Sequence, residues 1–157
     1  MTLVFFKWLA FASQAFFAGL TMSFMLLFLF YPTLTGRRPH EMIRTFHAIS
    51  PFQAIAMAGW LLSSLFVRYL EDGFLAWSLA TQWQQLDMAS VVILVALFVS
   101  AFSLEFWTAE PLRRCIAREI PWDDGRTFRR SLRNIKLHLT LNTLLILAWF
   151  ACKSFVF

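Results

Sequence analysis

Four long apolar segments divide the chain, and polar residues collect in the stretches between them. The segments cover roughly residues 8–31, 44–67, 87–107 and 136–156. Each is long enough to cross about 30 Å of hydrocarbon as a helix that rises 1.5 Å per residue. With long uninterrupted apolar runs and few glycines, the pattern favours helices over a transmembrane barrel. It predicts an all-α integral membrane protein with a single transmembrane domain over residues 1–157.

The first segment has one feature of a secretory signal peptide, the small-residue pattern Ala10-Phe11-Ala12. Its apolar run continues to Phe30, however, well beyond the roughly 7–15 residues that are typical of a signal peptide. The basic region before it consists of Lys7 alone. We therefore expect this segment to be a membrane helix.

Charge is distributed unevenly along this pattern. The chain is 59% hydrophobic and only 15% charged, an apolar content that a soluble domain of this length cannot bury. Eleven of the fourteen Lys and Arg residues lie in stretches 32–44 and 108–136, whereas Lys7, Arg68 and Lys153 lie elsewhere. The positive-inside rule places both basic stretches in the cytoplasm. We therefore expect an up-down four-helix bundle with both termini on the non-cytoplasmic side.

The basic residues around the predicted third and fourth helices indicate the expected partners. Because they flank membrane spans, the net charge of +5 does not indicate a nucleic-acid partner. We expect them to contact anionic lipid headgroups on the cytoplasmic side of a bacterial inner membrane or an equivalent membrane. The residues concerned are Arg113, Arg114, Arg126, Arg129, Arg130 and Arg133.

The stretch RTFHAISPFQ, residues 44–53, allows two interpretations of where the second helix begins. Ser50 and Pro51 suit the N-cap and the first position of a helix, which would leave His47 in a separate surface helix. Alternatively, one helix runs through Pro51, which has no amide to bond to the carbonyl of His47 and so kinks the helix. A helix from Pro51 to Val67 would have only seventeen residues, the lower limit for crossing a membrane. We favour the continuous helix.

Three titratable side chains fall at a similar depth in the predicted bundle. His47, Glu105 and His138 each lie about eight residues, or roughly 12 Å, to the cytoplasmic side of the middle of their segment. His138 also shares a helix face with Asn142. Two imidazoles and a carboxylate are ligands that divalent metal ions accept, and two histidines can instead hold a haem b iron from both sides. The second and fourth helices are diagonal in an up-down bundle, which suits a flat cofactor better than one ion.

Each of these residues also has a structural interpretation. The two histidines can hydrogen-bond to a neighbouring helix near the headgroups. Glu105 can pair with Arg133, Lys136 or a histidine, or it can relay a proton or cation, because carboxylates inside membranes often mark such pathways. No nucleophile–base pair, glycine-rich phosphate loop or pair of catalytic carboxylates can be assembled from the sequence. We therefore have no argument for an enzyme.

Several short motifs are carried by the same regions: YPTL at 31–34, FHAIS at 46–50, WTAEPLR at 107–113, and a histidine, His138, near the start of the fourth helix. In these motifs the chain resembles the TMEM205-like family of four-helix membrane proteins, which is defined largely by a domain of unknown function. The resemblance covers most of the chain and implies a four-helix membrane fold without an assigned chemistry. The family is expected to carry asparagine where this chain has Glu105, so no role is transferred to that residue.

Three hypotheses for function follow. The first is a small integral membrane binding protein that holds a metal ion or haem in the layer of His47, Glu105 and His138. The second is a non-catalytic accessory subunit of a larger respiratory, photosynthetic or transport complex, or a self-associating protein, in which the histidines are structural. The third, a transporter or proton pathway through Glu105, is disfavoured because four helices make a poor conduit unless they oligomerise.

Overall fold

A computed structural model describes residues 1–34, 39–72, 82–109 and 126–154 of the chain. Within these ranges, some residues near the helix ends are described by their backbone only. They are residues 29–34, 39–44, 47, 72, 82, 83, 126–129 and 132.

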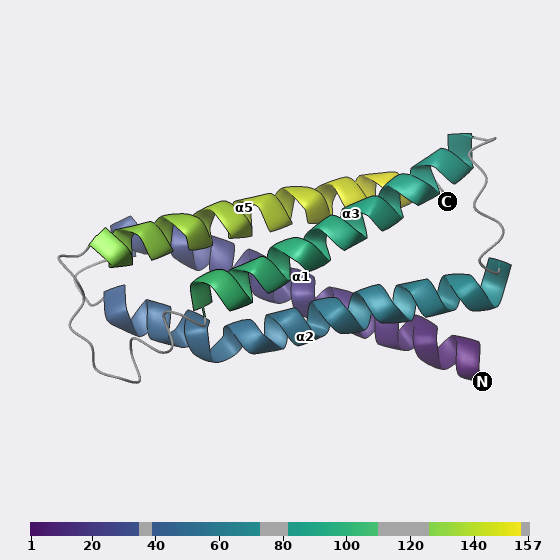
Figure 1. Ribbon diagram of the computed structural model, residues 1–157, viewed down its shortest axis with the longest axis horizontal. Coiled ribbons are helices and arrows are strands. Elements are labelled where there is room, and N and C mark those ends of the chain that lie inside the picture. Colours follow the sequence, from purple (N-terminus) through teal and green to yellow (C-terminus); the bar gives the residue numbers. More distant parts are fainter. Residues whose placement is uncertain (35–38, 73–81, 110–125, 155–157) are drawn as a thin grey trace.

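The described part of the chain is entirely helical, as the sequence predicts (Figure 1). Helix α1 covers Thr2–Leu34, α2 covers Pro39–Asp72, α3 covers Gln82–Leu104 and α5 covers Arg126–Ser154. A π-helical turn, η1, extends α3 over Glu105–Ala109. The predicted segments 8–31 and 44–67 lie inside α1 and α2, segment 87–107 ends within η1, and the last two residues of segment 136–156 lie outside the described residues. The helices extend beyond the apolar runs because their polar ends continue the same backbone hydrogen bonds outside the hydrocarbon.

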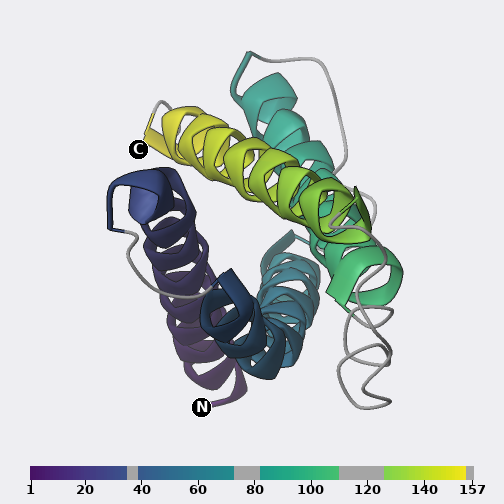
Figure 2. The ribbon, with the colours of Figure 1, turned by 90° about the vertical axis from the view of Figure 1, so that its left-hand side faces the viewer.

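Each helix packs against two others, and consecutive helices run in opposite directions (Figures 1 and 2). Helix α1 packs against α2 and α5, and α3 packs against the same two helices from the other side. Helices α2 and α5 are therefore diagonal neighbours, as expected for the second and fourth helices of a bundle. The amino and carboxyl ends of the described chain lie at the same end of the bundle (Figure 1).

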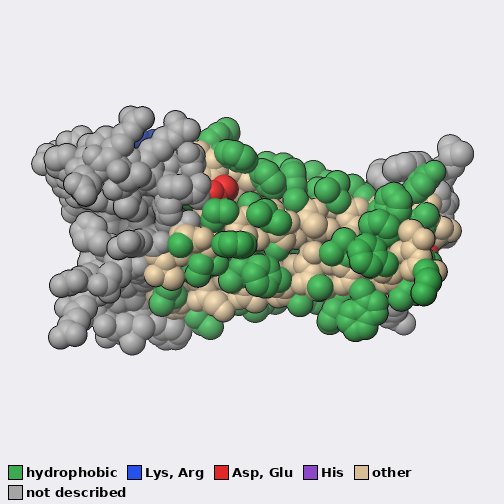
Figure 3. All heavy atoms as spheres, turned by 90° about the horizontal axis from the view of Figure 1, so that it is seen from below, with side chains coloured by type: hydrophobic (Ala, Val, Ile, Leu, Met, Phe, Trp, Pro, Cys, Tyr) green, Lys and Arg blue, Asp and Glu red, His purple; other side chains and the backbone are tan. Residues whose placement is uncertain are grey.

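All four helices are long and apolar enough to cross a membrane. The qualifying stretches are Thr2–Phe28, Ala48–Glu71, Gln84–Ala109 and Arg133–Ser154. Large hydrophobic side chains also cover the outside of the bundle, with Phe11, Ile55, Val92, Leu137 and Leu144 all more than half exposed. Figure 3 shows this apolar surface along the middle of one face. In water such a surface would drive aggregation, whereas in lipid it is the expected surface of a membrane bundle.

Two hydrophobic clusters form the interior. The first lies toward the termini and includes Phe17, Met57, Trp60, Leu97 and Ile146. The second lies toward the opposite end and includes Phe24, Phe28, Phe46, Leu104, Ile135 and Leu139. In the second cluster Phe46 packs edge-on against Phe24 and Phe28, with ring centroids 5.0 and 5.7 Å apart. The clusters join all four helices.

Helix α2 passes through Pro51 without interruption. The interpretation of one continuous helix is thus confirmed, and the alternative of a helix beginning at Ser50 is wrong. Ser50 is not an N-cap because it lies inside α2, and its hydroxyl donates to a side chain of another helix. Residue 47 therefore belongs to the same helix as the rest of the second span, one turn before Ser50.

Candidate functional site

Glu105 is a buried carboxyl group at the junction of α3 and the π-helical turn. Its side chain is 8% exposed, and its Oε2 accepts a hydrogen bond of 2.6 Å from the Ser50 hydroxyl of α2. A buried carboxyl group needs such a donor, because burial without compensating hydrogen bonds is costly. The pair therefore fixes α2 against α3 at the end of the bundle that lies away from the termini.

The π-helical turn begins at Glu105 itself. Such turns add one residue to a helical turn and are found often at functional sites. Here the turn also buries Thr108 and Ala109 and leaves Trp107 exposed. The position of Glu105, which the sequence singled out as an unusual intramembrane charge, thus coincides with a local irregularity of the backbone.

His138 lies on α5 and contacts α3. Its Nδ1 is 3.2 Å from the Ser100 hydroxyl, and the ring is partly buried. Of the described side chains only Ser100 forms a hydrogen bond with the ring. This is the kind of contact to a neighbouring helix that the structural interpretation of the histidines predicts.

Interhelical contacts show that Glu105 and His138 lie at different levels, meaning different positions along the bundle axis. Ser50 lies beside Glu105, whereas Ser100, more than one turn earlier on α3, lies beside His138. His138 is therefore displaced by about 7.5 Å along the bundle from Glu105, toward its middle. By the same register His47 lies about one turn to the other side of Glu105, and the two histidines differ in level by roughly 12 Å.

Glu105 and His138 therefore make separate interhelical contacts, and a shared site of His47, Glu105 and His138 stays a prediction. Within the described residues no three His, Cys, Asp or Glu side chains lie close enough to hold a metal ion. The His47 side chain lies outside the description, so its partners are not assigned. A single haem ligated by both histidines fits poorly with their difference in level, because both ligands must reach the same iron along one axis.

The arginines expected at lipid headgroups lie mostly outside the described side chains. Arg113 and Arg114 belong to residues 110–125, and Arg126 and Arg129 are described by their backbone alone. Arg130 and Arg133 are both exposed on the first turns of α5. Their contact with anionic lipid stays a prediction.

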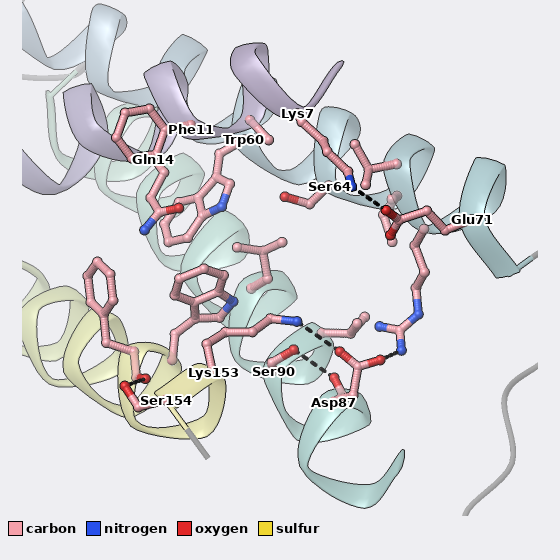
Figure 4. A pocket seen from close by; sticks show the side chains of 18 residues that line it. Lys7, Phe11, Gln14, Trp60, Ser64, Glu71, Asp87, Ser90, Lys153 and Ser154 are labelled. Atoms are coloured by element: carbon pink, nitrogen blue, oxygen red, sulfur yellow. Dashed lines mark hydrogen bonds and ion pairs between the residues drawn. The ribbon is translucent and has the colours of Figure 1, made fainter. Parts of the chain in front are cut away.

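A cavity of about 560 Å³ opens at the other end of the bundle, near the termini (Figure 4). All four helices contribute to its lining. Pockets that bind small ligands typically measure roughly 300–1,000 Å³, so this one is large enough to hold a ligand. Sequence analysis did not predict this cavity.

Five charged side chains surround the outer part of the cavity, and we call them the charged ring: Lys7, Arg68, Glu71, Asp87 and Lys153. Lys7 pairs with Glu71 at 2.5 Å, and both are well exposed. Asp87 pairs with both Arg68 and Lys153, the latter at 2.8 Å, and these three side chains are partly buried. The charged ring thus connects α1 to α2, and α2 to α3 and α5.

The inner part of the cavity is aromatic and uncharged. Trp60 is almost completely buried, and its ring meets Trp149 edge-on with centroids 5.0 Å apart. Phe11 and Gln14 of α1 line the same region. Figure 4 shows Gln14 and Trp60 at the opposite end of the cavity from Glu71 and Asp87. The cavity is consequently amphipathic along its length.

One signal for the charged ring was present in the sequence. Lys7, Arg68 and Lys153 form the smaller group of basic residues that sets topology. Each lies near the end of an apolar segment, and in the predicted topology all three lie on the non-cytoplasmic side. Glu71 and Asp87 also lie near the ends of apolar segments, on the same predicted side of the membrane. That combination of opposite charges at one end of a bundle indicates ion pairing between helices.

Comparisons with known protein families, curated proteins and solved structures find no match to this chain. The resemblance to the TMEM205-like family therefore stays a prediction, and function has to be argued from the site.

Proposed function

We propose that this protein is a small integral membrane binding protein that takes an amphiphile with an anionic head group into the cavity near its termini. The observation that carries the proposal is the cavity itself, which has aromatic walls inside and the charged ring outside. An amphiphile has the same division between an apolar body and a charged end.

The proposal includes an orientation in the membrane. The bundle is inserted up-down with both termini on the non-cytoplasmic side, which the concentration of basic residues in 32–44 and 108–136 supports. The cavity then opens near the outer headgroups. An amphiphile partitioned into that leaflet reaches the cavity with its head near the charged ring.

The charge of the ring supports an anionic head. Of the five charged side chains that line the cavity, three are cations and two are carboxylates. Arg68 and Lys153 share the single carboxylate of Asp87. A carboxylate or phosphate head group can accept hydrogen bonds from Lys153 without breaking its pair with Asp87, because an ammonium group has three donors.

Quenching of tryptophan fluorescence tests the proposal directly, because Trp60 and Trp149 line the cavity. The purified protein in mild detergent is titrated with three doxyl-labelled probes that share one alkyl chain and carry a carboxylate, a hydroxyl or a trimethylammonium head. We expect saturable quenching, with the carboxylate probe bound roughly tenfold more tightly than the cationic one. Trp60→Phe identifies the part of the signal that comes from the cavity.

Lys153→Gln should remove most of the preference for the carboxylate probe, whereas Lys136→Gln, toward the other end of α5, should preserve it. Equal affinity for all three heads would contradict the anionic head group but not the cavity. No saturable quenching by any probe would contradict the amphiphile site altogether.

A metal ion or haem near Glu105 is the second candidate, supported by the burial of this carboxyl group at a π-helical turn close to His47. Because Glu105 lies nearer in level to His47 than to His138, an ion shared by His47 and Glu105 is the favoured form. Elemental analysis and a reduced-minus-oxidised visible spectrum test it. Metal that is lost in both His47→Ala and Glu105→Gln supports the ion site, and a metal-free, colourless sample contradicts it.

The accessory-subunit hypothesis makes a different prediction for the whole particle. Its support is the aromatic surface, including exposed Phe106 and Trp107 in the π-helical turn. A native mass many times 18.3 kDa after mild extraction would favour it. A particle of one or two chains that binds the carboxylate probe would favour the amphiphile-binding protein instead.

A further inference from the structure

A layer of buried polar side chains separates the two hydrophobic clusters. Each long helix contributes one of them, and we call the set the polar layer: Thr21, Gln53, Ser100 and Asn142, none more than 6% exposed. On its own helix each residue lies between a member of the first cluster and a member of the second. The polar layer therefore lies within the spans, enclosed on both sides by apolar packing.

Three members of the polar layer have hydrogen-bond partners. Gln53 Nε2 donates to the Thr21 hydroxyl over 2.6 Å, which links α2 to α1. The Ser100 hydroxyl lies 3.2 Å from Nδ1 of His138, which links α3 to α5. These pairs satisfy polar groups that otherwise would lose hydrogen bonds on burial in lipid.

Asn142 differs from the other three. Its side chain is fully buried, and neither Nδ2 nor Oδ1 has a hydrogen-bond partner among the described residues. An amide that forms no hydrogen bond inside a membrane is unfavourable, and such groups in folded proteins are usually satisfied by protein or by ordered water. The position also does not line the cavity, so an amphiphile bound there does not satisfy it.

The chemistry of the amide limits what can bind it. A cation would suit Oδ1 but would be repelled by the Nδ2 protons, and an anion would suit Nδ2 but not Oδ1. A ligand that only accepts hydrogen bonds would leave Oδ1 unsatisfied. A small neutral molecule that both donates and accepts satisfies both atoms, and water is the smallest.

His138 is a partner that such a molecule can bridge to. It precedes Asn142 by four residues on α5, so the two side chains are neighbours on one helix face, with Cβ atoms about 5–6 Å apart. Polar groups of neighbouring side chains can be joined by one water that makes a hydrogen bond of about 2.8 Å to each. Ser100, bound to the same imidazole, continues the chain of hydrogen bonds to α3.

We propose that the polar layer is a binding site for ordered water, which bridges the amide of Asn142 to the imidazole of His138. This inference is independent of the amphiphile site. A bound water gives His138 a proton-exchange partner inside the span, so the His138–Asn142 pair is a local proton-exchange site rather than a ligand set for metal.

The two asparagines of the chain make a direct experiment possible. Asn134 and Asn142 are the only ones, so ¹⁵N-asparagine labelling yields two side-chain amide signals. In deuterated protein in lipid bilayers, solid-state NMR measures magnetisation transfer from water to each amide. We expect transfer to Asn142 as well as to partly exposed Asn134, which serves as the internal reference. Asn134→Gln assigns the signals without changing the polar layer.

His138→Leu should reduce the transfer to Asn142 at least severalfold. Thr143→Val is the matched control, because its hydroxyl bonds to the Leu139 carbonyl of the same helix and lies outside the bridge. Transfer to Asn134 alone would overturn the proposal. If transfer to Asn142 is unchanged in His138→Leu, the bound water is supported but its bridge to His138 is overturned.

Discussion

Gly59 of α2 lies close to the side chain of Ser13 of α1. A Cβ placed at Gly59 would come within 2.9 Å of the Ser13 hydroxyl oxygen, whereas a Cβ at Gly19 would meet nothing within 4 Å. We expect Gly59→Ala to be less favourable than Gly19→Ala by roughly 1 kcal/mol in the free energy of unfolding, because the Ser13 hydroxyl has to rotate to make room. Gly19→Ala, the matched control, should be neutral or stabilising by up to about 1 kcal/mol. Thermal unfolding in detergent measures both, and equal effects would contradict the close approach at Gly59.

The hydrogen bond between Ser50 and Glu105 provides a second prediction for single residues. Ser50→Ala removes a donor from a buried carboxyl group, and we expect a loss of about 1–3 kcal/mol in unfolding free energy. Ser103→Ala on α3 is the control, because the Ser103 hydroxyl forms no hydrogen bond with a described residue. Chemical denaturation followed by circular dichroism compares them. A loss in Ser103→Ala as large as that in Ser50→Ala would contradict a specific role for the pair.

At the scale of the element, α2 shows how tertiary packing can override a local signal. Serine followed by proline is a good helix start, yet α2 continues through Pro51. Pro51→Ala restores an amide that can bond to the carbonyl of His47, and we expect it to raise the unfolding free energy by roughly 1–3 kcal/mol. Thermal unfolding with circular dichroism checks this. A loss of stability would mean that the packing of α2 requires the shape that Pro51 imposes.

The helix ends illustrate how far apolar runs predict elements. The apolar run of the fourth segment begins near residue 136, but α5 begins at Arg126. A run of hydrophobic residues marks the part of a helix that lipid or protein covers, and it does not mark the polar turns that continue beyond it. The early start of α1 at Thr2 has a different reason, because residues 3–6 are apolar and belong to the span Thr2–Phe28.

At the scale of the whole molecule, the charged ring predicts that the free energy of unfolding depends on the carboxylate of Asp87. Asp87 pairs with a cation from α2 and another from α5, and all three side chains are partly buried. We expect Asp87→Asn to lower the unfolding free energy by about 1–3 kcal/mol, between the values for exposed and for fully buried pairs, because two cations lose their partner. Glu71→Gln, which breaks an exposed pair, should cost less than about 1 kcal/mol. Thermal unfolding of the two variants makes the comparison, and a similar loss in both would contradict the central role of Asp87.

The sequence by itself determined the class of this protein: an all-α chain with four helices able to cross a membrane. Hydrophobic periodicity and length are local properties, and lipid leaves few alternatives for the backbone. It also singled out Glu105, because a charge inside an apolar run is conspicuous. Only the tertiary structure decided that Glu105 bonds to Ser50 and that His138 lies at a different level beside Ser100. It likewise revealed the cavity and the unpartnered amide of Asn142. These features depend on the rotation and register of one helix against another, which are set by contacts between distant residues and leave little trace in any single segment.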